Sequence, residues 1–280
     1  MNAGQYFNFN DKILRTGKAI ITADNRSFRY GDGFFETMKM VNGKIALGNY
    51  HFERLFSALD ILKFKKPPYF TTEHVETLAR TLAIKNGHEK LARVRLTIFR
   101  GDGGLYDAAD QFPNYIIQTW KLDPGIFKLN ENGLATDIYT EAKKSCDSFS
   151  HIKSNNYLPY VMAAGWAKEK KLNDAFLLNN FNRLADATIA NVFIVKDGKV
   201  KTPSLSEGCV SGVMRRHLLA CMRKENIPVE ETQIETEEIF EANEIFLTNA
   251  VNGIRWVKQC GKSNYNLQLA KYLFEKFTGN

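Results

Sequence analysis

Three short segments contain residues that could take part in chemistry, and each is a weak indication when taken alone. Lys153 stands in the segment 152–158 as one of many lysines, and most lysines are solvated surface residues. The two glycines of 31–33 indicate a turn. The segment 211–215 indicates the start of a helix, whose first backbone N–H groups can bind a phosphate. The order and spacing of these segments along the chain tell more than any one of them.

The histidines and cysteines form no metal-binding or redox motif. The five histidines lack HExxH or similar spacing, and the four cysteines contain no CxxC pair. Unpaired cysteines without a signal peptide are typical of a reducing compartment, so we expect a soluble, cytoplasmic protein with no metal site. The longest apolar stretch, around 157–167, is too short to span a bilayer, so no membrane partner is expected.

The composition favours a globular protein that binds small molecules. At 280 residues, with 44% hydrophobic and 25% charged residues, the chain can bury a sizeable core in one large or two medium domains. The net charge of +7 is scattered among acidic residues, so we expect no nucleic-acid partner. A modest attraction for anionic metabolites is the better interpretation of this charge.

The spacing of apolar residues predicts the strands and helices that can position these segments. In the first part, strands are predicted at 6–9, 12–14, 34–41, 44–47, 92–99 and 115–120, with tight turns at Asn10-Asp11 and Asn42-Gly43. Helices are predicted at 49–62, with Asn49 as the N-cap, and at 72–86, which Gly87 ends.

Turn residues divide the chain into two predicted domains. Pro124-Gly125 and Asn132-Gly133 interrupt the pattern, so we expect a smaller domain at 1–121, a linker at 122–133 and a larger domain at 134–280. In the larger domain, strands are predicted at 134–140, 175–178, 192–195, 199–202 and 244–248, and helices at 158–171, 212–226, 236–241 and 266–277. The fold class is therefore α+β with two domains.

Seven segments, taken in order, resemble the class IV aminotransferase family, also called fold-type IV pyridoxal-phosphate enzymes. The resemblance covers nearly the whole chain and rests on residues 30–37, 51–55, 153–158, 185–193, 202–203, 212–215 and 244–257. The family includes branched-chain aminotransferases, D-amino-acid aminotransferases and 4-amino-4-deoxychorismate lyases. The resemblance implies the D-amino-acid aminotransferase-like fold and pyridoxal 5′-phosphate as cofactor. Because the family is typically dimeric, it also implies a homodimer.

The resemblance also assigns cofactor-binding roles. Lys153 matches the Schiff-base lysine, which holds the cofactor and later moves a proton at the substrate α-carbon; it must be neutral to attack. Arg54 matches the phosphate arginine, and the alternative is a solvated helix arginine. The other phosphate-side positions are the backbone N–H groups of Val213 and Met214, and the segment Asn249 and Ala250, where Asn249 can instead be a turn residue.

Two further residues match positions around the cofactor ring. The family places a glutamate beside the pyridine nitrogen to keep it protonated, but this chain has Asp186, one methylene shorter. Either the backbone moves inward or a water bridges the gap, and the alternative is a structural turn aspartate. Tyr157 matches a tyrosine that can hydrogen-bond the phenolic oxygen of the ring, unless it is a packed core residue.

The resemblance leaves the reaction open between two branches. Phe35-Glu36-Thr37, the Gly103-Gly104 loop, Met214 and Asn249-Ala250 favour the lyase branch, which releases pyruvate from aminodeoxychorismate and gives 4-aminobenzoate. The alternative is a branched-chain or related amino-acid aminotransferase that uses 2-oxoglutarate. The D-amino-acid branch lacks its arginine and histidine here. Both remaining reactions begin with removal of the same proton, so cofactor residues do not separate them.

The substrate side of the site is less defined. Phe35 is a candidate substrate contact, and Arg95, Arg100 and Arg255 are candidate partners of a substrate carboxylate, each against a structural alternative. An outside alternative is a degenerate relative that binds the cofactor without turnover, which the change to Asp186 and the presence of Met214 keep open.

Overall fold

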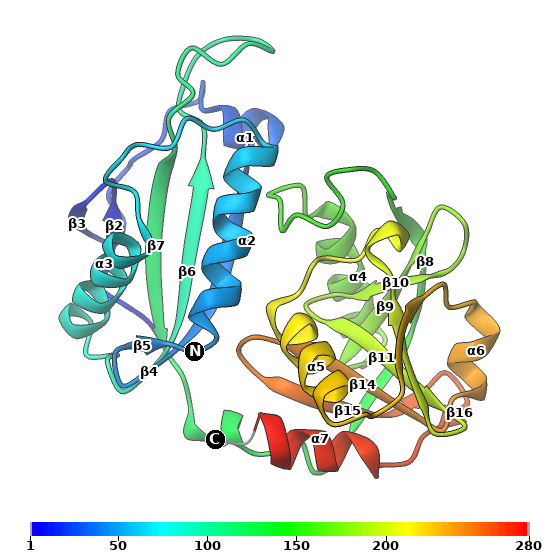
Figure 1. Ribbon diagram of the computed structural model, residues 1–280. Helices are drawn as coiled ribbons and strands as arrows, with labels where there is room; N and C mark the ends of the chain where they lie inside the picture. Colours follow the sequence, from blue (N-terminus) through cyan, green and yellow to red (C-terminus); the bar gives the residue numbers. More distant parts are fainter. Residues whose placement is uncertain (1, 279–280) are drawn as a thin grey trace. The chain divides into compact units, whose positions relative to one another are not determined.

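The computed structural model describes residues 2–278, which form two compact units (Figure 1). The first unit comprises Met1–Pro124 with Ile152–Asn156, and the second comprises Gly125–His151 with Tyr157–Asn280. The division after Pro124 falls inside the predicted linker 122–133. The segment around Lys153, however, belongs to the first unit and not to the second domain, where the sequence analysis put it, because it pairs with a strand of the first unit.

The first unit is built on a seven-stranded sheet with the order β3-β2-β7-β6-β4-β5, in which β1 pairs with β7. Its strands are β1 (Asn2–Ala3), β2 (Tyr6–Phe9), β3 (Lys12–Arg15), β4 (Gly33–Val41), β5 (Lys44–Ile45), β6 (Leu91–Phe99) and β7 (Asn114–Lys121). Its helices are α1 (Arg26–Tyr30), α2 (Gly48–Ile61) and α3 (Thr72–Lys85).

The two faces of this sheet differ in character because side chains alternate along each strand. On one face, Met38, Val94 and Leu96 are buried in a core that also contains Leu55 of α2 and Leu82 of α3. The opposite face, which we call the open face, carries the residues at alternating odd positions of β4 and β6. The predicted alternation at 92–99 is confirmed, since every second side chain of β6 is buried.

Turns and caps of the first unit largely match the sequence predictions. At the Asn42-Gly43 turn both residues have positive φ angles, 48° and 76°, as tight hairpin turns require. Gly87 follows α3 with a φ of 68°, which confirms it as the residue that ends this helix. The predicted N-cap Asn49 is wrong. The helix α2 begins one residue earlier, and its N-cap is Leu47 in the left-handed conformation, because β5 is only two residues long.

The second unit is built on a nine-stranded sheet with the order β10-β9-β8-β15-β14-β11-β12-β13, in which β16 pairs with β15. Its strands are β8 (Leu134–Lys144), β9 (Asp174–Asn179), β10 (Leu184–Ala187), β11 (Asn191–Lys196), β12 (Lys199–Pro203), β13 (Val229–Thr232), β14 (Glu244–Asn249), β15 (Gly253–Cys260) and β16 (Ser263–Asn264). Its helices are α4 (Leu158–Glu169), α5 (Val213–Lys224), α6 (Thr236–Glu241) and α7 (Leu269–Phe277). Single 3-10 turns, η1 (Pro124–Phe127) and η2 (Leu205–Glu207), complete the regular elements.

The sheet of the second unit mixes strand directions. The strand β8 is parallel to β9 and β15, and β12 is parallel to β13, whereas the other pairs are antiparallel. Six helices and strands were not predicted from the sequence: α1, β1, β10, β13, β15 and β16. The strand β10 has only four residues and carries Asp186, so its apolar pattern is too short to recognise.

Candidate active site

The segment that carries Lys153 is attached to the edge of the first sheet. Phe35 N–H donates to the carbonyl of Lys153 at 2.9 Å, and Asn155 N–H donates to the carbonyl of Gly33 at 2.9 Å. Gly33 has no room for a side chain, because a Cβ there would lie 2.3 Å from the carbonyl oxygen of Ile98. The same Cβ would lie 2.7 Å from Asn155 Nδ2, so the glycine lets this segment approach closely, and the two hydrogen bonds hold the backbone of Lys153 against β4.

The side chain of Lys153 lies on the open face beside an aromatic ring. The Phe35 ring centroid lies 4.9 Å from Lys153 Nζ and 3.8 Å from the guanidinium carbon of Arg95. Aromatic rings attract cations at such distances, and the ring presents both groups on the same face of the sheet. The structure thus brings together three residues selected from the sequence: Lys153, Phe35 and Arg95.

The predicted phosphate arginine, Arg54, is held by a buried carboxylate. Its Nε and Nη2 atoms donate to the two oxygens of Glu36 at 2.6 and 2.7 Å, and His51 Nδ1 lies 2.7 Å from the same carboxylate. Burial by itself raises the pKa of Glu36, but the charge of Arg54 and the hydrogen bonds from His51 and Arg54 outweigh it and lower the pKa to about 2. This pair fixes the plane of the guanidinium.

Arg100, a candidate substrate cation, is engaged in contacts that organise the loop before β4. Its Nε atom lies 3.3 Å from Asp32, its Nη2 atom donates to the carbonyl of Leu62, and its guanidinium covers the ring of Phe64 at 4.1 Å. The side chain is buried. These contacts match the structural alternative for Arg100.

In the second unit, Asp186 is buried and held by three donors. Tyr160 Oη donates to one carboxylate oxygen at 2.8 Å, and the N–H of Val210 donates to the same oxygen at 2.8 Å. Asn191 Nδ2 donates to the other oxygen at 2.8 Å. All three donors are uncharged, so they orient the carboxylate without neutralising its charge. A carboxylate held in this way is suited to a cationic ring nitrogen.

Tyr157 lies at the start of α4 and stacks on Tyr160. The two rings are 4.2 Å apart with an interplanar angle of 17°. Tyr157 is half-buried, whereas Tyr160 is buried. Burial and the nearby charge of Asp186 raise the pKa of Tyr160, so its phenol stays protonated and remains a donor.

The start of α5 has donors suited to a phosphate. The helix begins at Val213, followed by Met214, and Gly212 is its N-cap. Because a glycine has no side chain, nothing from the cap residue occupies the first N–H groups of this twelve-residue helix. A Cβ at Gly212 would lie 1.8 Å from Asn191 Oδ1, so the position accepts no other residue without movement. Within the described residues, the buried hydroxyl of Thr248 also lacks a hydrogen-bond partner.

The remaining predicted residues lie at the C-terminal end of β14, next to Thr248, in the turn that follows, and on β15. Asn249 Oδ1 accepts hydrogen bonds from the N–H groups of Val251 and Asn252, which makes it the turn residue that the alternative described, and Ala250 lies inside this turn. Arg255 Nη1 donates to the carbonyl of Lys128 at 2.9 Å, and burial lowers the pKa of its guanidinium.

Three residues of these clusters carried no assigned role in the sequence analysis: Glu36, Tyr160 and Thr248. Glu36 stood in a quoted motif, but only the structure pairs it with Arg54. Tyr160 lies seven residues after Lys153 inside an apolar helix, where it reads as a core residue. A buried threonine at the end of a strand gives no signal in the sequence, because threonine is common in strands.

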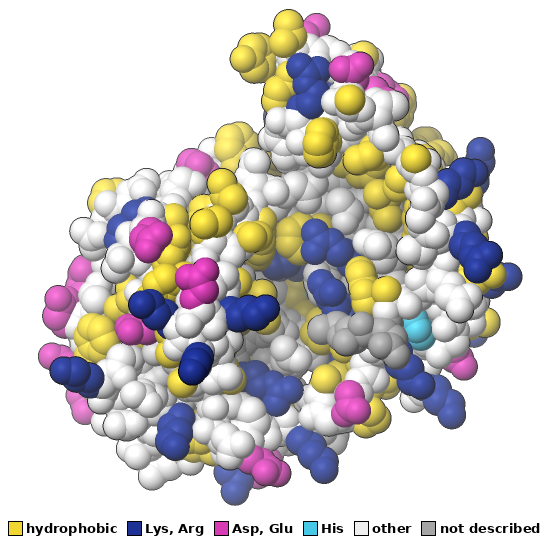
Figure 2. All heavy atoms as spheres, turned by 180° about the vertical axis from the view of Figure 1, so that it is seen from behind, with side chains coloured by type: hydrophobic (Ala, Val, Ile, Leu, Met, Phe, Trp, Pro, Cys, Tyr) yellow, Lys and Arg dark blue, Asp and Glu magenta, His cyan; other side chains and the backbone are white. Residues whose placement is uncertain are grey.

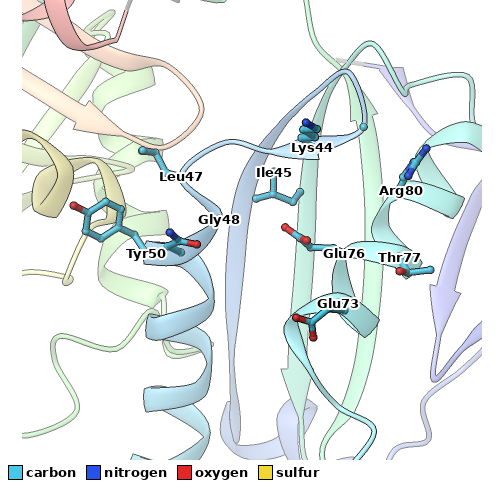
Figure 3. A pocket seen from close by; sticks show the side chains of 11 residues that line it. Lys44, Ile45, Leu47, Gly48, Tyr50, Glu73, Glu76, Thr77 and Arg80 are labelled. Atoms are coloured by element: carbon cyan, nitrogen blue, oxygen red, sulfur yellow. The ribbon is translucent and has the colours of Figure 1, made fainter.

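A pocket of about 640 Å³ lies in the first unit, away from the predicted residues (Figure 3). It lies among β5, the start of α2 and α3, and is lined by Gly43, Lys44, Ile45, Leu47, Gly48, Asn49, Tyr50, Glu73, Glu76, Thr77 and Arg80. Its acidic groups, Glu73 and Glu76, lie on α3 (Figure 3). None of the predicted site residues lines it, and we assign it no chemistry.

The sequence match is consistent with this geometry. Residues 33–260 match the amino-transferase class IV family. The chain belongs to this family. It is similar to an aminodeoxychorismate lyase of Vibrio harveyi, at 28% identity over 82% of this chain and 83% of the relative, and to a putative branched-chain-amino-acid aminotransferase of Methanocaldococcus jannaschii, at 27% identity over 96% and 93%. The fold is similar to that of a branched-chain aminotransferase of Thermoproteus uzoniensis, with a TM-score of 0.86, 20% identity and coverage of 98% of this chain and 93% of that one.

Family membership confirms the expected fold class and a pyridoxal-phosphate-dependent enzyme. No helix in the described part of the chain has the length and apolar character that crossing a membrane requires. Among residues 2–278, no group of three or more histidine, cysteine, aspartate or glutamate side chains is arranged to hold a metal ion.

Proposed function

We propose that this class IV enzyme is an aminodeoxychorismate lyase, which converts 4-amino-4-deoxychorismate into 4-aminobenzoate and pyruvate. The observation that carries the catalytic part is the position of Lys153, whose amine lies 4.9 Å from the Phe35 ring centroid, with Arg95 against the same ring. The lyase branch is supported by the Vibrio harveyi relative and by Met214, Gly103-Gly104 and Asn249-Ala250.

The side chains and backbone of this chain fit pyridoxal phosphate. In the second unit, the uncapped start of α5 at Val213 and Met214 and the buried hydroxyl of Thr248 offer donors for the phosphate. In the first unit, the guanidinium of Arg54 is the group that the family resemblance assigns to the phosphate. Asp186, fixed by Tyr160 and two other donors, would hold a proton on the ring nitrogen. We keep Tyr157 as the partner of the phenolic oxygen of the ring.

Pyridoxal phosphate, when bound, withdraws electrons from the substrate carbon that bears the amine. We assign Lys153 to bind the cofactor covalently and then to take the proton from that carbon. The pyruvyl ether bond then breaks, the leaving oxygen departs with the pyruvyl group, and the ring becomes aromatic. Atoms balance, since 4-aminobenzoate and pyruvate together equal the substrate. Arg95 is the assigned partner of a substrate carboxylate.

The first test is the visible spectrum of the purified protein, followed by borohydride reduction and peptide mass spectrometry. We expect a cofactor band and a reduced cofactor adduct on Lys153. The variant Lys153→Ala should show neither the adduct nor release of pyruvate. No cofactor band after reconstitution, or an adduct on another lysine, would contradict the proposal. Turnover of aminodeoxychorismate is measured by the appearance of pyruvate and 4-aminobenzoate.

A branched-chain or related amino-acid aminotransferase is the second candidate. It is favoured by the Methanocaldococcus jannaschii relative, which the chain matches over 96% of its own length. L-Leucine, L-valine or L-glutamate, added without an oxo acid, would then bleach the cofactor band. A band that persists with all three amino acids, together with release of pyruvate from aminodeoxychorismate, supports the lyase. A band without either activity would indicate a degenerate relative that binds the cofactor.

We also propose a homodimer. In the first unit, the loop between β6 and β7 exposes 65% of Leu105 and 90% of Tyr106, and hydrophobic side chains gather on this projecting loop at the top of Figure 2. In the second unit, most residues of α4 are apolar, and three of them, Leu158, Val161 and Met162, are exposed. An exposed apolar helix face is typical of a protein interface. Light scattering should give twice the mass of one chain. Val161→Glu should weaken the dimer, whereas Ile84→Glu, at an exposed apolar position of α3, should not.

A further inference from the structure

The open face of the first sheet places three cationic side chains near one another. In the antiparallel pairing of β4 and β6, Lys39 lies directly opposite Arg93, and Thr37 lies opposite Arg95. Alternation puts these residues on the same face as Phe35, beside which Lys153 lies. The candidate catalytic lysine and the cations therefore share one surface within one unit.

The burial of Lys39 and Arg93 is unfavourable for the sheet itself. A buried cation loses the hydration that stabilises its charge. Lys39 is only 6% exposed, and burial lowers the pKa of both Lys39 and Arg93, which means that burial disfavours their charged forms. A sheet selected for stability alone would carry an apolar or oppositely charged residue at one of these positions.

Aromatic rings hold the two guanidinium groups of this face. The guanidinium carbon of Arg93 lies 4.7 Å from the ring of Trp120, its neighbour on β7, as that of Arg95 lies 3.8 Å from the ring of Phe35. Such stacking fixes a guanidinium while its N–H groups can still donate in the ring plane. Both arginines are thus positioned in a way that suits recognition of carboxylates.

The spacing suits a substrate with more than one negative charge. Successive side chains on one face of a strand are about 7 Å apart. Arg95 is one such step from the level of Phe35 and Lys153, and Lys39 and Arg93 are one step further. Because the lysine side chain is long, the ammonium of Lys39 can lean toward a molecule whose amine is at Lys153, while the two guanidinium groups stay on their rings.

We propose that Lys39 and Arg93 form, next to Arg95, an anion subsite that selects amines carrying two carboxylates over amines carrying one. The inference rests on the proposed function, since it takes Lys153 as the centre of the reaction. The chemical class includes linear dicarboxylic amino acids and cyclic amines such as aminodeoxychorismate. Arg95 binds one carboxylate, and Lys39 and Arg93 bind the second, whose negative charge favours the charged forms that burial disfavours.

Calorimetric titration of the cofactor-loaded protein with glutarate and with butyrate tests the subsite without any turnover. These probes differ in the second carboxylate. We expect glutarate to bind about tenfold or more tightly than butyrate. Lys39→Met and Arg93→Met should each remove most of that difference and leave butyrate unchanged. Lys44→Met, at an exposed position of β5 in the same unit, is the matched control and should change neither.

Thermal unfolding separates a binding role from a structural one. If Lys39 serves binding, Lys39→Met removes a buried charge and the melting temperature does not fall. A lower melting temperature together with equal weakening of both probes would overturn the proposal. So would an unchanged preference for glutarate in both variants.

The two sources of the ligand are distinguished by substrate kinetics. Lys39→Met should lower kcat/KM about tenfold for aminodeoxychorismate if the natural ligand is cyclic, and for L-glutamate if it is linear. Equal kcat/KM in wild type and variant for both would overturn the inference. Failure of the proposed function is seen separately, as the absence of the cofactor band and of the Lys153 adduct, which Lys39 and Arg93 do not supply.

Discussion

Each unit buries one carboxylate near predicted cofactor residues, and the two carboxylates have different kinds of hydrogen-bond donors. In the first unit, Glu36 is paired with the cation Arg54 and contacts His51. In the second unit, Asp186 accepts hydrogen bonds from a phenol, an amide and a backbone N–H, all of them uncharged. The negative charge of Glu36 therefore meets a cationic side chain, whereas these three donors to Asp186 orient its carboxylate without carrying a charge.

This difference separates structural from functional burial of charge. A buried ion pair fixes the direction of Arg54, and loss of either partner leaves the other charge buried. Neutral donors orient a carboxylate without cancelling its charge, which suits a position that meets a cationic group. We therefore expect changes at Glu36 to act mainly on stability, and changes at Asp186 mainly on cofactor chemistry.

The largest effect is expected from Glu36→Gln. The substitution leaves the guanidinium of Arg54 without its counter-charge, and such a loss costs about 3–5 kcal/mol of unfolding free energy. Urea denaturation of the two proteins measures it. The control is Glu53→Gln, at an exposed position of α2, the helix that carries Arg54. It should change stability by less than about 0.5 kcal/mol. A stable Glu36→Gln protein would mean that the comparison is wrong for the first unit.

The same carboxylate should make the protein sensitive to acid. The pKa of Glu36 is about 2 in the folded protein against an ordinary value of 4.5, so the folded form holds its proton less tightly than the unfolded form. The resulting stability, about 3 kcal/mol, is fully present above about pH 4.5 and is lost as the pH falls toward 2. Denaturation midpoints measured between pH 6 and pH 2 should show this fall in the wild type. In Glu36→Gln the fall should be smaller by that amount, and equal slopes in both proteins would contradict it.

Asp186→Asn should lower the activity more than the stability. Without the carboxylate, the ring nitrogen loses its proton partner, and we expect turnover to fall about 100-fold or more. Stability should change by only about 1–2 kcal/mol, since the amide oxygen can still accept from Val210 and only one oxygen is replaced. Asp174→Asn, at another buried aspartate of the second unit that accepts from Thr188, should cost stability but leave the cofactor spectrum unchanged. Equal activity loss in both variants would indicate that Asp186 is structural.

The sequence predicted long elements well and the clusters around these carboxylates poorly. The helix predicted at 72–86 and the strand alternation of β6 follow from local spacing, and both are found. The pairing of Lys153 with β4 depends on a contact between residues more than a hundred positions apart, which no local pattern contains. The partners of Asp186 come from α4, β11 and the segment before α5, so they meet only after folding.

Tyr160→Phe gives the smallest effect and the sharpest test of how Asp186 is held. The substitution removes the 2.8 Å hydrogen bond to the carboxylate but keeps the ring that stacks on Tyr157. We expect a loss of about 1 kcal/mol in cofactor binding, or up to tenfold in turnover, measured by fluorescence titration with the cofactor and by steady-state kinetics.

A double-mutant cycle shows whether Tyr160 acts through Asp186. If it does, Tyr160→Phe has little further effect on cofactor affinity in the Asp186→Asn background, and the two changes are not additive. Tyr265→Phe, which removes a buried phenolic hydrogen bond to Ile239 in the same unit, should lower stability without changing cofactor affinity. Additive effects of Tyr160→Phe and Asp186→Asn would mean that the phenol contributes only to packing. In that case the donors that orient the shorter aspartate would include Asn191 and Val210 but not the phenol.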